Sequence, residues 1–302
     1  MSVLRMPVGW MSAVVGVSCG CAAWGAAPLW QDDFDDGIPL NQKYEDTEAS
    51  GMSQSAVASL TGTHSLQQQY SVGQVGAGWV IKLVDHLGKD GPVFMRYYHL
   101  FEDGFQGFPP KMARIRYRNR STWTSPLGIH IWLETSGSNA GKVCLDIKAS
   151  DSSQANSLGW LPLAVSPFSY ADVSNIGRWV CFELEVKLNT PGQADGWFNL
   201  WIDNRLAVGR LNVDFRGSQT YGLNECMLDC YWNGGSPKAQ SRFYDAFVVS
   251  LERIGMIPPP NAAPVLAPIG SRSAPAGERL QFTVEATDAD GNELQYSATG
   301  EQ

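Results

Sequence analysis

Apolar and polar residues alternate with a period of two along most of the chain between residues 28 and 256. Clear runs of this kind are 129–134, 143–147, 180–188 and 198–202. Alternation is typical of antiparallel strands with one buried face, because successive side chains leave opposite sides of the pleat. Turn sequences rich in Gly, Pro, Asn and Ser separate the runs. The pattern predicts an all-β sandwich of two sheets.

The first residues are typical of an export signal. Arg5 supplies a positive charge, residues 11–23 are small and apolar, and 25–27 reads Gly-Ala-Ala, which suits cleavage. We therefore expect residues 1–27 to be a signal peptide and the protein to be secreted or held at the cell surface. The apolar run is shorter than the roughly 20 residues that span a bilayer. No later segment is long enough either, so we expect no membrane span.

A proline-rich stretch, residues 257–264, follows the alternating region. It is typical of a stiff linker, because proline cannot donate a ladder hydrogen bond. Residues 28–256 are thus the main domain. Residues 265–302 contain further strand-like sequence, but they are fewer than the ~100 of a complete immunoglobulin-like sandwich. Their small number predicts an incomplete immunoglobulin-like module.

The net charge limits which partners the protein surface can bind. The net charge is −8, so the surface as a whole does not favour nucleic acid, and an anionic partner needs a local basic patch. One strand offers such a patch, with Arg114, Arg116, Arg118 and Arg120 on one face and Lys111 just before it. Guanidinium groups bind carboxylate or sulfate bidentately. Two interpretations stand: a stripe for a polyanion, or a solvated face balanced by Asp and Glu.

Aromatic residues suggest a second binding feature. His130, Trp132 and Glu134 share one face of a predicted strand. Together with Trp197 and Trp201, Trp132 is a candidate platform for stacking sugar rings. The alternative is that these tryptophans pack beneath a covering loop.

Four cysteines remain beyond the predicted signal, and an exported chain permits disulfides. We expect the pairs Cys144–Cys181 and Cys226–Cys230, although the sequence alone does not fix the pairing.

Several segments resemble bacterial polysaccharide lyases of the concanavalin A-like superfamily, such as heparin, alginate and glucuronan lyases. These segments are 29–37, 93–105, 109–116, 177–192, 195–203 and 243–255. The resemblance implies a jelly-roll sandwich acting on an acidic, uronate-containing polysaccharide by β-elimination. Residues 263–300 resemble the immunoglobulin-like or cadherin-like modules of bacterial surface proteins.

The resemblance also implies roles for particular residues. A β-eliminating lyase needs a cation for the uronate carboxylate, a base for the C5 proton and an acid for the leaving oxygen. Arg116 or Lys111 is the candidate cation, and His130 or Tyr98 the candidate for proton transfer. The chain has Gly128-Ile129-His130 where such lyases have Gln-Ile-His, and it has no Tyr-Phe-Lys-Ala-Gly strand. The candidate substrate-binding residues are Arg96, Arg114, Arg118, Trp132, Glu134 and Trp201.

Two further possibilities remain open. Glu183 and Glu185 are two apart, as a hydrolase pair would be, but the Glu-x-Asp-x-x-Glu motif of laminarinase-type enzymes is absent. Relatives of this fold also bring their first and last strands together around a cation, which makes Asp33 and Asp245 candidate calcium ligands. The alternative for Asp33 is a solvated turn. Non-catalytic glycan binding or adhesion is the main alternative to a lyase.

Overall fold

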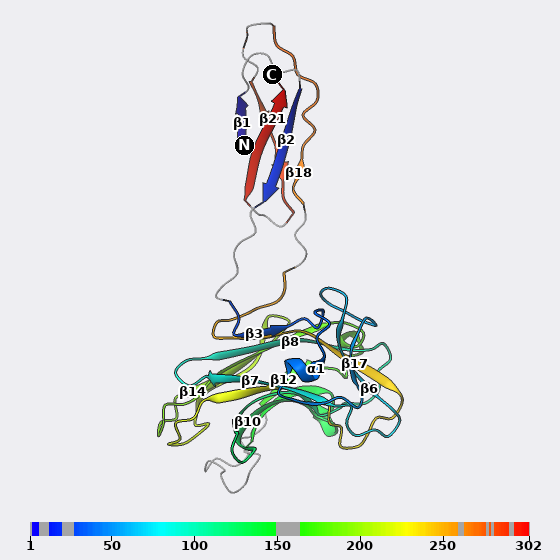
Figure 1. The fold of residues 1–302 in the computed structure, drawn as a ribbon, viewed down its shortest axis with the longest axis vertical. Coiled ribbons are helices and arrows are strands. Elements are labelled where there is room, and N and C mark those ends of the chain that lie inside the picture. Colours follow the sequence, from blue (N-terminus) through cyan, green and yellow to red (C-terminus); the bar gives the residue numbers. More distant parts are fainter. Residues whose placement is uncertain are drawn as a thin grey trace. The chain divides into compact units, whose positions relative to one another are not determined.

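The chain forms two compact units (Figure 1). The larger is Gly25–Met256, and the smaller combines Met1–Trp24 with Ile257–Gln302. The computed structural model describes residues 2–5, 12–19, 27–148, 164–258, 263–275, 278, 281–289 and 293–301. Residues 25–26 of the expected cleavage site and 259–262 of the expected linker lie outside this range.

The larger unit is a sandwich of two antiparallel sheets (Figure 1). Sheet 1 has the strand order β12-β11-β10-β9-β16-β7-β4. Its strands are β4 (Asp46–Glu48), β7 (Trp79–Leu87), β9 (Lys111–Asn119), β10 (Thr124–Leu133), β11 (Lys142–Lys148), β12 (Ala164–Ser169) and β16 (Leu223–Asp229). The predicted all-β, two-sheet jelly-roll sandwich is confirmed.

Sheet 2 has the order β15-β14-β13-β8-β17-β6-β5, and β3 pairs with β17. Its strands are β3 (Trp30–Asp32), β5 (Met52–Ser55), β6 (Ser65–Tyr70), β8 (Val93–Phe101), β13 (Val180–Lys187), β14 (Gly196–Ile202), β15 (Arg205–Val213) and β17 (Gln240–Ser250). The helical elements are short: α1 (Leu40–Lys43), η1 (Gly137–Asn139) and η2 (Val173–Asn175). None of the described helices is long and apolar enough to cross a membrane.

The hydrophobic core lies between the two sheets. Ile115 and Ile129 of sheet 1 and Phe182 and Leu200 of sheet 2 belong to it, each at most 1% exposed. Side chains at alternate positions on the same strands leave the opposite face. The outer face of sheet 1 therefore points away from the outer face of sheet 2, and residues on the two outer faces do not meet.

One histidine is sealed inside the core. His99 on β8 has its Nδ1 2.8 Å from the hydroxyl of Tyr170. Its ring also packs edge-on against Phe101 and Tyr244. Burial first, and then the charge of Arg242, lower the pKa of His99 well below its ordinary 6.5. The folded protein therefore holds a neutral imidazole.

Replacing His99 should change how stability depends on acid. A histidine whose pKa is depressed in the fold takes up a proton on unfolding, so stability falls as pH drops below 6.5, by about 1.4 kcal/mol per pH unit. We measure the free energy of unfolding in urea between pH 6.5 and 5. In His99→Phe we expect the histidine's contribution to the slope of this free energy against pH to disappear. Tyr170→Phe is the control, because it removes the hydrogen bond at every pH and leaves the slope in place. Identical slopes for His99→Phe and the wild type would contradict the assignment.

The smaller unit joins both ends of the chain. In it β1 (Ser2–Arg5) pairs with β19 (Gln281–Val284), and β2 (Ser12–Cys19) pairs with β21 (Leu294–Glu301). A further pair joins β18 (Val265–Leu266) to β20 (Ala286–Thr287). Residues expected to form a signal peptide thus lie in strands beside the C-terminal segment. Cleavage near residue 27 and an immunoglobulin-like module stay predictions.

The predicted disulfides are wrong. Cys144, Cys181, Cys226 and Cys230 are all buried free thiols. Cys144 lies on sheet 1 and Cys181 on sheet 2. Burial raises the pKa of each of these two thiols to about 12, which keeps them protonated and unreactive.

Candidate functional site

The outer face of sheet 1 carries most of the predicted site residues. On β9, Arg114 lies directly opposite His130 of β10, and His130 lies opposite Asp146 of β11. On the other side of β9, Arg116 lies opposite Glu225 of β16. These residues alternate with the core isoleucines of the same strands. They therefore form transverse rows on one surface of four neighbouring strands.

The arginine ladder is paired with carboxylates. Arg116 Nε binds Glu225 Oε1, and Arg118 Nε lies 2.7 Å from Glu225 Oε2. Arg114 pairs with Asp229, and Arg120 pairs at the surface with Asp85. Of the two interpretations of the ladder, charge balance by acidic neighbours describes Arg114, Arg116 and Arg118. The face is not solvated, however, because the Arg116 side chain is only 9% exposed and that of Glu225 is 0% exposed.

His130 contacts a buried carboxylate. Its Nδ1 lies 3.0 Å from Asp146 Oδ1, and both side chains are buried. Burial is the largest influence and lowers the pKa of His130, the charges of Arg114 and Arg116 lower it further, and Asp146 opposes them. A neutral imidazole whose Nδ1–H faces a carboxylate has its lone pair on Nε2. A carboxylate beside Nδ1 therefore favours the tautomer whose Nε2 is free of a proton.

A cationic and aromatic group lies at the start of β9. Lys111 is opposite Trp132 in the ladder, and its Nζ lies 4.4 Å from the ring centroid of Tyr231. Tyr231 is 44% exposed and lies two residues beyond the end of β16. Asp229 positions it, because Asp229 Oδ1 accepts the Tyr231 amide as well as that of Cys230. A cation, a phenol and an indole therefore share one end of the face.

Trp79 adds a hydrogen-bond donor to the same end. It lies opposite Asp229 in the ladder between β7 and β16, so it shares the outer face. Its indole nitrogen is buried and has no hydrogen-bond partner among the described residues. Buried indole N–H groups are normally bonded, so an unpartnered one is unusual at this end of the face.

Other predicted site residues lie on sheet 2. Arg96 and Tyr98 face outward from β8, where they lie opposite Glu183 and Cys181 of β13. The Arg96 guanidinium donates to the carbonyls of Gly255 and Ala246. Tyr98 is only 4% exposed. The structure therefore brings together Lys111, Arg116 and His130 but not Tyr98, which lies on the opposite side of the sandwich.

The two glutamates considered as a hydrolase pair, Glu183 and Glu185, each bind neighbouring parts of the fold. Glu183 accepts the amides of Ile254 and Gly255, which ties down the chain after β17. Glu185 accepts a hydrogen bond from Asn199. These contacts describe structural carboxylates rather than a hydrolase pair.

Trp201 and Trp197 lie on β14 of sheet 2, against Arg253 and Lys187. Neither lies on the face that carries Trp132. Glu134 follows β10 directly, where its main chain continues the ladder to Lys142 and Gly141.

The two candidate calcium ligands, Asp33 and Asp245, lie in different surroundings. The expected pairing of first and last strands is present, because β3 pairs with β17. Asp245 is buried, and its oxygens accept hydrogen bonds from the amides of Leu60, Thr61 and Ala246 and from the Thr61 hydroxyl. Asp33 is exposed and accepts the Asp35 amide.

The donors around Asp245 do not fit a metal ligand, because N–H groups occupy the oxygens that a cation would need. Within the described residues, no group of three or more His, Cys, Asp or Glu could hold a metal ion. Calcium at Asp33 and Asp245 stays a prediction, which thermal unfolding with and without added calcium would test.

Comparisons with known proteins fix the architecture. No protein-family model and no curated protein matches the chain. Among solved structures, the PL-14 alginate lyase of Aplysia kurodai matches with a TM-score of 0.56 at 13% identity, covering 74% of this chain and 99% of that chain. The endo-β-1,4-glucuronan lyase of Trichoderma reesei matches with a TM-score of 0.51 at 15% identity, covering 74% and 95%. This is the jelly-roll polysaccharide lyase fold.

A third structure has the same lyase fold. A variant of alginate lyase Aly36B in complex with alginate tetrasaccharide matches with a TM-score of 0.51 at 14% identity, covering 76% of this chain and all of that chain. The predicted resemblance to concanavalin A-like polysaccharide lyases is confirmed at the level of fold. The immunoglobulin-like resemblance of the tail is not part of these matches.

The sequence patterns did not single out five residues of this lyase-fold surface. They are Trp79, Asp146, Glu225, Asp229 and Tyr231. Glu225, Met227, Asp229 and Tyr231 alternate along segment 223–231 just as the arginines do. That alternation was the available signal, since it marks a strand with an acidic outer face. The pairing of segment 223–231 with the strand that carries the arginines could not be predicted from the sequence, because the paired residues lie more than 100 positions apart.

Proposed function

We propose that the jelly-roll domain binds an acidic, uronate-containing polysaccharide along the outer face of sheet 1 and cleaves it by β-elimination. The observation that carries the proposal is the gathering of Lys111, His130, Trp132 and Tyr231 on one face of neighbouring strands. It is supported by the similar folds of an alginate lyase, a glucuronan lyase and a lyase in complex with alginate tetrasaccharide. The predicted export signal agrees with a polymeric substrate outside the cell.

The groups on this face suit the steps of β-elimination. His130 Nε2 takes the proton from C5 of the uronate, and the electron pair left behind forms the C4–C5 double bond. The C4–O bond to the preceding sugar breaks, and the leaving oxygen takes a proton from an acid, the role that we propose for the Tyr231 phenol. The Lys111 ammonium faces the carboxylate and stabilises the negative charge that develops there.

The lysine–tyrosine pair has further support. The Aly36B complex with alginate tetrasaccharide was obtained for a variant in which one lysine and one tyrosine are replaced by alanine. Lys111 and Tyr231 are in direct contact here, at 4.4 Å from Nζ to the ring centroid. Trp132 offers an apolar surface for a sugar ring beside them, and the indole N–H of Trp79 offers a donor.

The test uses the full chain and a panel of polymers. Alginate, glucuronan, heparin and pectate are incubated with the protein, and the ultraviolet absorbance of the unsaturated product is followed. We expect product from at least one acidic polymer and none from a neutral glucan, which has no carboxylate to acidify its C5 proton. Retained binding of an acidic polymer without any product would overturn the lyase proposal.

One observation favours the alternative, glycan binding without cleavage. Glu225 already occupies the Nε atoms of Arg116 and Arg118, so these guanidinium groups are partly committed to the fold. A binding surface needs no acid–base pair, and Lys111 with Trp132 would suffice for it. The polymer assay separates the two functions, because a non-catalytic binder yields no unsaturated product.

Lys111→Ala should weaken the binding of acidic polymer. Loss of one charge-assisted contact, worth about 1.5–3 kcal/mol, corresponds to at least about a tenfold rise in Kd or KM. Lys238→Ala is the matched control, because Lys238 lies between β16 and β17 rather than on a strand of this face and donates to the Gly104 carbonyl. Binding is measured by isothermal titration calorimetry with alginate oligosaccharides. Equal loss in both variants would show a general charge effect and contradict the local role of Lys111.

A further inference from the structure

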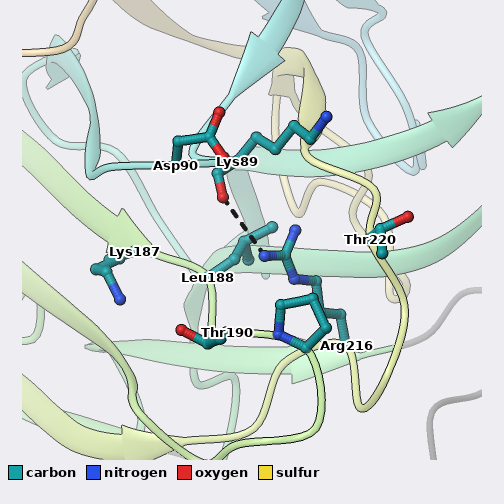
Figure 2. A pocket seen from close by; sticks show the side chains of 8 residues that line it. Lys89, Asp90, Lys187, Leu188, Thr190, Arg216 and Thr220 are labelled. Carbon is teal, nitrogen blue, oxygen red and sulfur yellow. Dashed lines mark hydrogen bonds between the residues drawn. The ribbon is translucent and has the colours of Figure 1, made fainter.

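A second basic site lies at one end of the sandwich, apart from the outer face of sheet 1. Here a pocket of about 340 Å³ is formed by the turn after β7, the loop after β13 and the segment between β15 and β16 (Figure 2). Its lining includes Lys89, Lys187 and Arg216 as cations and Asp90 as the one carboxylate. A cationic pocket stands out on a chain whose net charge is −8.

Arg216 is the central residue of this pocket. It is only 3% exposed, and its guanidinium is fixed by main-chain carbonyls. Nε donates to Asn189 O at 2.9 Å and Nη1 to Tyr221 O. Nη2 donates to Lys89 O at 3.4 Å, the bond that Figure 2 shows. Three of the five N–H donors of the guanidinium are thereby used, which leaves two for a ligand.

The charge of Arg216 lacks a carboxylate partner. Among the described residues, no ion pair joins Arg216 to an Asp or Glu side chain, whereas Arg114, Arg116 and Arg118 each have one. Burial is the largest influence on the pKa of Arg216 and lowers it from its ordinary value, while the nearby charges of Asp90 and Asp195, which make no ion pair with the guanidinium, oppose that shift. Buried charges are normally paired, so the site is suited to an anion.

Arg242 shows that burial alone does not make such a site. It is also fully buried, but its guanidinium lies near the Tyr70 and Tyr244 rings, at 5.9 and 5.4 Å from their centroids. Its Nε also donates to the Gln68 side chain. Aromatic faces and protein acceptors surround that charge, whereas Arg216 borders open space.

The pocket walls are held in place by hydrogen bonds. Asn189 is fully buried, and its side-chain oxygen accepts the amides of Phe215 and Arg216. Its side-chain nitrogen donates to Gly217 O. Asp195 accepts both the amide and the hydroxyl of Thr190, and its Oδ2 lies 3.9 Å from Lys187 Nζ, so it also holds that cation beside the pocket. The loop after β13 is thus tied to the segment that carries Arg216, so the cations are positioned before a ligand arrives.

We propose that this pocket binds the carboxylate of an acidic saccharide, through Arg216, Lys187 and Lys89, as a second contact separate from the outer face of sheet 1. Guanidinium and ammonium groups suit an oxyanion, and the Thr190 and Thr220 side chains in the lining suit the sugar hydroxyls. The choice of an acidic saccharide rests on the proposed function, whereas the anion site rests on the pocket itself.

The test measures glucuronic acid binding by isothermal titration calorimetry, in the Lys111→Ala background so that sheet 1 contributes little. Arg216 is left intact, because its loss would leave three buried carbonyls without donors. The pocket variant is Lys89→Ala/Lys187→Ala, and we expect it to raise Kd at least about tenfold. The matched control is Arg205→Ala/Lys238→Ala, which removes the same charge outside the pocket lining and should change Kd less than about twofold.

Glucose and inorganic sulfate are the comparison ligands. The proposal is supported if glucuronic acid binds, glucose does not, and the pocket variant alone weakens binding. It is overturned if glucuronic acid fails to bind, if sulfate binds in its place, or if the two double variants behave alike. Product formation from polymers is measured separately. A failure of the lyase proposal therefore shows in that assay and leaves the glucuronic acid result unchanged.

Discussion

His130→Asn is expected to lower kcat on the cleaved polymer by about 10²–10⁴-fold, the usual contribution of a general base. Asparagine can still donate to Asp146 through its amide, so the local packing is kept while the basic nitrogen is lost. KM should change little, because Lys111 and Trp132 remain for binding. Rates are measured from the absorbance of the unsaturated product. A variant with nearly wild-type kcat would remove His130 from the reaction.

The pH dependence tests the same assignment independently. Burial depresses the pKa of His130 below its ordinary 6.5, so the base stays neutral at pH 6.5 and above. In the wild type, kcat/KM should hold steady as pH falls to 6.5 and should decline only in more acidic solution.

Asp146 raises the pKa of His130, so in Asp146→Asn the decline should move to still lower pH, alongside a lower plateau. A decline that moved to higher pH would show that Asp146 does not act on the base.

The faces of individual strands were predictable because they depend on local pattern alone. The alternation through His130 and Trp132, and through Arg114 and Arg116, correctly separates the outer face from the core. Which strands become neighbours depends on the whole topology. Tyr98 has the same outward parity as His130, yet β8 joins sheet 2 and β10 joins sheet 1. Parity therefore predicts a face but not the sheet to which that face belongs.

The partners of the charged residues were unpredictable for the same reason. Arg114 and Asp229 are 115 positions apart, and Arg116 and Glu225 are 109 apart. Only the placement of β16 beside β9 brings them together. The sequence therefore left open whether the arginine ladder binds a polyanion or is balanced by acidic neighbours, and in the fold it is largely neutralised. Lys111 was predictable as a cation, but its contact with Tyr231 was not.

Glu225→Gln is expected to destabilise the larger unit by about 3–5 kcal/mol, the usual cost of removing one partner from a buried ion pair. The Glu225 side chain is fully buried and is shared by Arg116 and Arg118. Glutamine removes the negative charge and adds an amide donor that faces two guanidinium groups. Chemical denaturation measures the change. The control is Asp85→Asn, whose exposed pair with Arg120 should contribute less than about 1 kcal/mol.

Replacement of the whole charged group then distinguishes stability from function. Glu225→Leu/Arg116→Met/Arg118→Met exchanges the shared carboxylate and both of its arginine partners for apolar side chains of similar size, which often restores or raises stability. We expect it to recover most of the stability lost in Glu225→Gln, yet to weaken the binding of acidic polymer, because the positive potential beside His130 falls. Recovery of stability together with unchanged binding would mean that the inner arginines serve the fold alone and that Lys111 and the aromatic residues at the start of β9 hold the polymer without them.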